Sequence, residues 1–217
     1  MDKAVFEVVT DAQTWYLLAR LLERPRGAWH DDVRALAAGP VGRDVRAAAA
    51  LAGDATQGEY LDRFGPSGVV SPREAAHCGM RDPGQLLADL QARYGAFGFQ
   101  AAAEDTLDHV AVEASFVAYL RLKEAYALAE GDAERAAIAR DAAATFIADH
   151  LQEMGEPIAS KLESAGDSSL ARAARAVAAR VGPPKTRAAS KIVWLEEEDA
   201  MSCGNAPGVA GRPMMAH

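Results

Sequence analysis

Cysteine is scarce in this sequence, and the two cysteines present lie far apart. Its 217 residues include only Cys78 and Cys203. That spacing excludes a framework of disulfides and a zinc site of the CxxC type. Two free thiols are typical of a protein that is kept in a reducing compartment.

Long apolar runs and an excess of positive charge are missing as well. No apolar stretch approaches the roughly 20 residues that span a bilayer, and the first residues lack the basic and then apolar pattern of a secretory signal. The 31 acidic residues outnumber the 23 lysines and arginines, which gives a formal net charge of -8. A general nucleic-acid binder needs cations to neutralise phosphates. We therefore expect a cytoplasmic protein with no integral membrane segment and no nucleic-acid partner.

Strand signals are sparse, and helical spacing replaces them. One short segment, KIVWL at residues 191–195, has β-branched residues in a row, and no hairpin signal accompanies it. Apolar residues elsewhere recur every three or four positions, which is the period of a helix face. The first such face comprises Val5, Val8, Ala12, Trp15, Ala19 and Leu22. The sequence predicts an all-α bundle of about nine to eleven helices.

Capping residues and helix breakers predict where these helices begin and end. In "SPRE", Ser71 is expected to cap a short helix with Pro72 at its first position. Pro157 is expected to interrupt a helix, because proline lacks the amide hydrogen that the helix needs. Further helix starts are predicted at Asp31 or Asp32, Asp54, Asp82, Asp105 or Thr106, Asp132 and Asp167.

A stretch rich in glycine and small residues predicts a hinge near residues 95–106. This hinge would separate an N-terminal helical half, residues 1–98, from a C-terminal half, residues 99–182. Residues 183–217 differ in composition, with a basic stretch, an acidic stretch and an end rich in Gly, Pro and Met. We expect this last segment to be a mobile tail.

Two pairs of side chains have a spacing that metal ligands use. His109 and Glu113 are four residues apart, and His150 and Glu153 are three apart, so each pair shares a helix face. Carboxylate-bridged metal bundles instead use Glu-x-x-His with further glutamates, and HExxH is absent here. In the plainer interpretation, Asp108 favours the start of a helix and Glu113 is solvated. A metal-binding protein or enzyme using these four residues remains the alternative.

Motifs for catalysis are missing from the sequence. It contains no GxSxG, no phosphate-binding GxxxxGK[ST] loop and no cysteine within a catalytic signature. This favours binding over catalysis, so we expect a protein that is not an enzyme and has no catalytic residues.

Four segments, taken in order, resemble the TorD/DmsD/NarJ family of molybdoenzyme maturation chaperones. They are EYLDRFGPSG at 59–68, SPREAAH at 71–77, LDHVAVEASF at 107–116 and FIADHLQEM at 146–154. The chain departs from the family pattern at Leu107, His77, Met154 and Arg73. These departures suggest the branch that serves periplasmic type II enzymes of the dimethyl-sulfoxide-reductase family.

The resemblance implies a TorD-like fold and a function without turnover. Such a chaperone binds the apo catalytic subunit of a molybdenum oxidoreductase through its N-terminal twin-arginine signal, assists insertion of the molybdenum cofactor and delays export. No cofactor is expected to bind stably, and only transient contact with the client's molybdenum cofactor is foreseen. The expected state is a monomer, and hinged halves would permit a domain-swapped dimer.

The same resemblance places client binding around the Asp-His pair. Carboxylates there would hold client guanidinium groups in bidentate pairs, and a helical groove would take the apolar part of the signal. The expected client-binding residues are Glu104, Asp105, Asp108, His109, Glu113, Phe116, Pro72 and His77.

Overall fold

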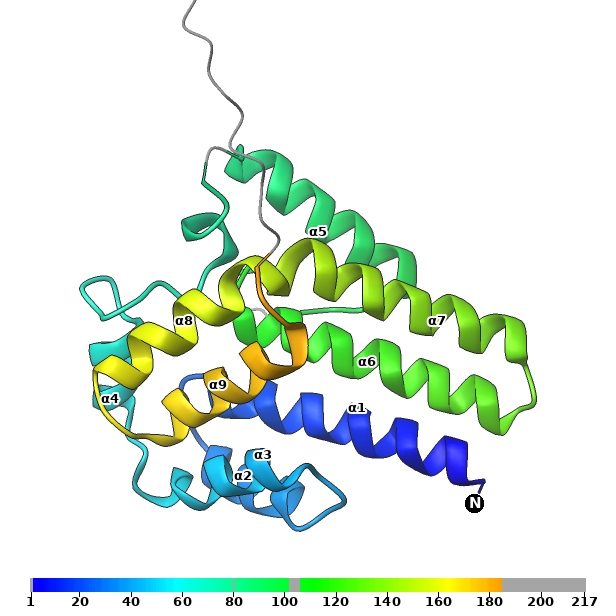
Figure 1. Ribbon diagram of the computed structural model, residues 1–217, viewed down its shortest axis with the longest axis horizontal. Coiled ribbons are helices and arrows are strands. Elements are labelled where there is room, and N and C mark those ends of the chain that lie inside the picture. Colours follow the sequence, from blue (N-terminus) through cyan, green and yellow to red (C-terminus); the bar gives the residue numbers. More distant parts are fainter. Residues whose placement is uncertain (1, 80, 102–105, 185–217) are drawn as a thin grey trace, which may run out of the picture. The chain divides into compact units, whose positions relative to one another are not determined.

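The central helices of the fold come from distant parts of the sequence. The computed structural model describes residues 2–79, 81–101 and 106–184. Helix α1 (Lys3–Leu22) packs along α6 (Val110–Ala129), which also packs against α7 (Ala133–Phe146). Figure 1 shows α6 lying between these two neighbours. The fold is therefore built around long helices whose buried faces meet across α6.

The remaining helices surround this centre. Helix α9 (Ser169–Val181) packs against α8 (Gln152–Ser164), α3 (Arg43–Ala50) and α1. The other elements are α2 (Trp29–Ala37), α4 (Gln57–Phe64), α5 (Pro83–Phe97), the 3-10 turns η1 (Ala52–Asp54) and η2 (Glu74–Ala76), and the π turn η3 (Ile147–Leu151). The described segments contain no strand, so the all-α prediction is confirmed. The candidate strand at 191–195 lies outside the described residues.

Helix α1 illustrates how the apolar period produces packing. Trp15, Ala19 and Leu22 lie on the predicted face and are buried. Asp2 caps the first turn by accepting a hydrogen bond from the amide of Ala4. The helix ends at Leu22 because Pro25 disfavours helical backbone in the residue before it.

Several predicted helix starts are confirmed, and others are wrong. Asp82 caps α5 and Asp132 caps α7, each by accepting from the amide three residues further on. Helix α6 begins later than predicted, because the ring of His109 caps it rather than Asp105 or Thr106. Ser168, not Asp167, caps α9, since the Asp167 carboxylate pairs with Arg172 instead.

The starts of α2 and α4 also differ from the prediction. Helix α2 has no side-chain cap at Ala28, and Asp31 and Asp32 lie inside its first turn. Thr56 caps α4 by accepting from the amide of Glu59, so this helix begins after Asp54 rather than at it. A favourable interaction of acidic residues with the first turn explains the position of the two aspartates in α2.

The predictions for "SPRE" and Pro157 are wrong. After Ser71 the chain stays extended through Arg73 and makes only the three-residue turn η2, because backbone bonds to the start of α6 hold it. Pro157 lies within α8 rather than between helices. The irregularity falls earlier, at the π turn η3, so that the proline occupies only the second turn of α8.

Helix α1 belongs to the predicted N-terminal half and α6 to the predicted C-terminal half. Because these two helices pack against one another, packing contacts cross the predicted boundary. All described residues belong to one compact unit, Met1–Lys185. The division at residue 98 and the hinge near 95–106 stay predictions, and residues 102–105 of that hinge lie outside the described part. The predicted mobile tail lies outside it as well, apart from residues 183 and 184.

Candidate functional site

Backbone hydrogen bonds join the loop at residues 71–77 to the start of α6. The amide of Val110 donates to the carbonyl of Pro72 at 2.9 Å, and the amide of Glu74 donates to that of Asp108 at 2.8 Å. An isolated β-bridge pairs Arg73 with His109 in the same place. Two segments that are more than thirty residues apart therefore form one structural unit.

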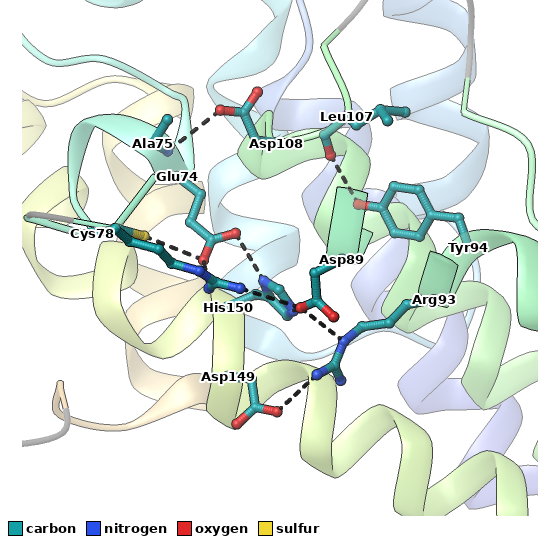
Figure 2. Close-up of polar contacts among 11 residues, drawn as sticks. Glu74, Ala75, Cys78, Asp89, Arg93, Tyr94, Leu107, Asp108, Asp149 and His150 are labelled. Atoms are coloured by element: carbon teal, nitrogen blue, oxygen red, sulfur yellow. Dashed lines mark hydrogen bonds and ion pairs between the residues drawn. The ribbon is translucent and has the colours of Figure 1, made fainter. Parts of the chain in front are cut away.

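Asp108 is a buried carboxylate with partners inside the protein. Its side chain is 0% exposed, and its two oxygens lie 3.0 and 3.2 Å from Nε of Arg73. The amide of Ala75 donates to the same carboxylate at 3.4 Å, as Figure 2 shows. The Arg73 side chain is 44% exposed. Asp108 is thus screened from solvent by an arginine of its own chain.

His109 caps α6 and links it to α4. The amide of Ala111 donates to Nδ1 of the ring at 3.1 Å, and Nε2 lies 3.0 Å from the hydroxyl of Tyr60. Because Nδ1 accepts a hydrogen bond, the neutral ring carries its proton on Nε2. This arrangement fixes the ring plane, and the edge of the ring packs against Phe64.

Glu113 is a buried carboxyl group of unusual character. It is 0% exposed, and neither oxygen has a hydrogen-bond partner of normal geometry among the described residues. Burial raises the pKa of Glu113 well above its ordinary value of 4.5, and the negative charges of Glu74 and Asp108 raise it further. The side chain is therefore buried in surroundings that favour its neutral acid form, whereas the plainer interpretation had it solvated.

Glu74 connects the loop to the π turn. Its Oε2 lies 2.9 Å from Nδ1 of His150, and its Oε1 accepts from the thiol of Cys78 at 3.4 Å. Arg81 approaches the same Oε1 at 3.6 Å. Figure 2 shows Glu74 and His150 pointing toward one another, both of them fully buried. The second and fourth of the family-like segments thus meet at this carboxylate.

Asp89 on α5 extends the network toward the surface. Its Oδ2 lies 3.3 Å from nitrogens of Arg81 and Arg93, and Arg93 also reaches Asp149 at 3.2 Å. Nε2 of His150 is 3.3 Å from the same Oδ2 without forming a hydrogen bond of good geometry. The His150 ring stacks on Phe146, with their centroids 4.6 Å apart.

Burial also suppresses ionisation of two neighbouring groups. It raises the pKa of the Cys78 thiol to about 12, with the charge of Glu74 as a further cause. Burial raises the pKa of Tyr94 as well, and its hydroxyl donates to the carbonyl of Leu107 at 2.9 Å. Neither group is poised for nucleophilic or acid–base chemistry at neutral pH.

The four residues of the metal-site alternative are not brought together as a ligand set. His109 faces Tyr60, whereas His150 faces Glu74 and Asp89. Within the described segments, no group of three or more His, Cys, Asp or Glu side chains could hold a metal ion. No observation in this part of the chain favours that alternative.

An open groove of about 500 Å³ lies beside the start of α6. Its apolar and polar walls include Tyr60, Leu61, Phe64, Pro66, Pro72 and His109. Three arginines, Arg24, Arg26 and Arg73, also line it. The groove is therefore bounded by the end of α1, by helix α4 and by the loop that meets α6.

The predicted client-binding residues fall into four groups. Pro72 and His109 line the groove. Asp108, Glu113 and Phe116 are buried behind it, Phe116 within an aromatic cluster with Tyr94 and Phe146. Glu104 and Asp105 lie outside the described residues, and His77 bonds to the carbonyl of Ser71. Direct contact between a client and Asp108 or Glu113 would require these buried groups to become exposed, and their role in binding stays a prediction.

Sequence reasoning missed three residues that shape this site. Glu74 is there only a member of the SPRE and SPREAAH segments, Tyr60 only a member of EYLDRFGPSG, and Arg24 is not singled out. Signals for the first two were present, because both lie within the family-like segments. Nothing in the sequence indicated Arg24, since its position depends on how α1 ends beside α4.

The described residues form an all-helical fold with a buried polar network and an adjoining groove. The family model described as "Nitrate reductase delta subunit" matches residues 27–160, more than half of the chain. The chain therefore belongs to this NarJ/TorD-type family of chaperones, which confirms the resemblance seen in the sequence. No curated protein matches the sequence.

Membership gives the broad function. The family consists of maturation chaperones for molybdoenzymes rather than enzymes, and it implies binding of a molybdoenzyme catalytic subunit. Among the described helices, none has the length and apolar character needed to cross a membrane.

Proposed function

We propose that this chain binds the apo catalytic subunit of a molybdenum oxidoreductase in the cytoplasm, through the groove beside the start of α6. The observation that carries this proposal is the position of the groove. It is walled by Tyr60, Pro72 and His109, which come from three family-like segments, and the buried network behind it holds two of these segments together. A groove of this size suits an extended peptide segment.

The segment that enters the groove is, in this proposal, the client's N-terminal twin-arginine signal. Asp108 lies directly behind Arg73, so a client guanidinium would reach it by taking the place of Arg73. Exchange of one arginine for another would conserve the charge-assisted hydrogen bonds of the buried carboxylate. Occupation of the signal would delay export, and the bound client would stay open for insertion of its molybdenum cofactor, which the chaperone touches only transiently.

Co-purification tests the binding surface directly. The tagged chain is co-expressed with the catalytic subunit of its host's molybdoenzyme in cells that cannot make molybdenum cofactor, and the bound subunit is quantified. Leu61→Lys alters a residue that lines the groove and is 41% exposed. We expect roughly tenfold weaker binding, because a lysine buried against the client would remove a large part of the binding free energy that one hot-spot contact supplies.

Leu122→Lys serves as the matched control. Leu122 is 56% exposed, lies on α6 and does not line the groove. This variant should bind the subunit as the wild type does. Failure of the wild-type chain to retain any catalytic subunit, or equal binding by the Leu61 variant, contradicts the proposal.

A further inference from the structure

The described charged residues that line the groove beside the start of α6 all carry one sign of charge. Among its described lining residues, the charged side chains are Arg24, Arg26 and Arg73, and no aspartate or glutamate accompanies them. The chain as a whole is acidic, with a formal net charge of -8. A basic groove on an acidic protein favours the binding of a negatively charged ligand.

Arg24 gives the strongest indication of such a ligand. Its Nε is buried and has no hydrogen-bond partner, and no ion pair involves its guanidinium group in the described part of the chain. Buried polar groups are nearly always hydrogen-bonded, because an unpaired donor loses its water without compensation. An arginine kept in this condition at the wall of a groove is explained by a ligand that accepts its hydrogen bonds.

Arg73 supplies further donors at the same groove. Only its Nε donates to Asp108, and its two terminal nitrogens make no hydrogen bond to the described residues. The side chain is 44% exposed, so these nitrogens are accessible from the groove. Arg73 therefore remains able to donate after it has neutralised Asp108.

Arginines at the other hollows of this unit are already engaged. In the hollow of about 500 Å³ between α2 and α3, Arg34 pairs with Asp31, and Arg46 donates to the carbonyls of Ala37 and Gly39. In the larger hollow of about 630 Å³ between α6 and α7, the basic residues Lys123 and Arg135 are accompanied by the acidic residues Glu130 and Asp132. Only the groove beside α6 combines one sign of charge with an unpaired guanidinium group among these described hollows.

We propose that this groove recognises an acidic side chain within an extended segment of the client, whose carboxylate accepts hydrogen bonds from Arg24 and Arg73. This inference rests on the proposed function and adds a requirement to it: beside its twin arginines the client segment carries an acidic side chain, which pairs with Arg24 and with the Arg73 that a client arginine displaces from Asp108. Guanidinium groups match a carboxylate in bidentate geometry. Phe64, Pro66 and Pro72 form apolar walls that suit residues flanking the acidic one, which favours a peptide over a free anion.

Peptide arrays test the requirement for a carboxylate. Overlapping segments of the catalytic subunits of the host's molybdoenzymes are probed with the full-length chain. Each bound segment should contain Asp or Glu, and its Asn or Gln version should bind at least roughly tenfold more weakly, as expected for a lost hydrogen bond to a charged group. The variant Arg24→Gln should show the same loss on the original segment and no further loss on the amide version.

Arg140→Gln is the matched control for net charge. Arg140 is 55% exposed on α7, pairs with the neighbouring Asp141 and lines none of these hollows. This variant should bind the acidic segment as the wild type does. The melting temperature gives a second readout, because removal of an unpaired buried donor should leave the stability of Arg24→Gln unchanged or raised, whereas a purely structural arginine would lower it.

The outcomes separate this inference from the proposed function. Equal binding of acidic and amide segments, or wild-type binding by Arg24→Gln, overturns the carboxylate site while binding of the catalytic subunit stands. Displacement of a bound segment by millimolar inorganic phosphate, with no preference for acidic segments, overturns it in favour of a phosphate site. Absence of any bound segment from any catalytic subunit, together with failure of co-purification, overturns both.

Discussion

Nε of Arg73 lies 3.0 and 3.2 Å from the two carboxylate oxygens of Asp108, and this contact covers a fully buried acid with a half-exposed base. Asp108 is therefore already paired with Arg73 of its own chain before any client binds. It also places an arginine of the protein where a client arginine would have to bind.

The first prediction concerns the stability that Asp108 provides. Asp108→Asn should lower the free energy of unfolding by about 1–3 kcal/mol, because it weakens hydrogen bonds to Arg73 and to the amide of Ala75. Urea denaturation measures the change. Asp141→Asn, which alters an exposed pair with Arg140, should change little, and equal effects of the two variants would show that the buried contact adds nothing.

The second prediction concerns exchange at the same carboxylate. If a client arginine replaces Arg73, then Arg73→Gln should bind a twin-arginine signal peptide more tightly than the wild type, because no internal partner competes for Asp108. Isothermal titration with a twin-arginine peptide and its twin-lysine version measures the difference. Weaker binding of the arginine peptide by Arg73→Gln would rule out the exchange and assign Arg73 to direct contact with the client.

The third prediction follows from the neutral state of Glu113. Its pKa is raised in the folded protein, so unfolding above pH 4.5 releases a proton and the group stabilises the fold less as pH rises. This loss begins at the unfolded value of 4.5 and continues up to the raised folded value. Glu113→Gln imitates the neutral acid and cannot ionise, so its stability relative to the wild type should increase from pH 5 to pH 8.

Thermal unfolding of both proteins across this pH range measures the effect of Glu113. Glu130→Gln, which alters an exposed residue directly after α6, provides the comparison. A constant difference between wild type and Glu113→Gln at all pH values would mean that Glu113 ionises equally in the folded and unfolded chain.

The fourth prediction uses Cys78 as a reporter of opening. Because its pKa is raised to about 12, the thiol should react with iodoacetamide at pH 8 far more slowly than a free cysteine. The measurement requires Cys203→Ala, so that mass spectrometry follows one thiol. Bound client should accelerate the labelling if it separates the loop at residues 71–77 from α6, and should slow it if the network stays closed.

The fifth prediction separates packing from recognition at Phe116. This residue is 1% exposed among Tyr94 and Phe146, so Phe116→Ala should cost about 3–5 kcal/mol of stability. Phe116→Leu should remain folded with a lower melting temperature. Client binding by the folded leucine variant should equal that of the wild type, and a selective loss of binding would restore Phe116 to the client-binding surface.

The helical class followed from the sequence, for identifiable physical reasons. Apolar residues at helical spacing in α1 predicted its buried face, and Asp82 and Asp132 predicted the starts of their helices, because these are local effects. The motif containing Asp108 and His109 lies where a loop, α4 and α6 meet, and its role in client binding stays a prediction.

Long-range contacts were beyond the reach of sequence patterns. His109 caps α6 because Tyr60 and the loop at residues 71–77 hold its ring in place, whereas Thr106 had the better intrinsic propensity. The burial of Glu113 was missed because a glutamate is rarely fully buried, and only the assembled network reveals its neutral state. Arg24 became noteworthy only when its lack of partners was visible.

The packing of α1 against α6 has a consequence for biosynthesis. The apolar face of Lys3–Leu22 meets its partner only after Val110–Ala129 has left the ribosome, which separates the two helices by nearly ninety residues of intervening chain. Closing a loop of that length makes folding slow compared with a bundle of adjacent helices. A nascent chain that stops before Val110 lacks this partner helix, so part of the apolar face that contains Trp15, Leu18 and Leu22 stays exposed until α6 is made.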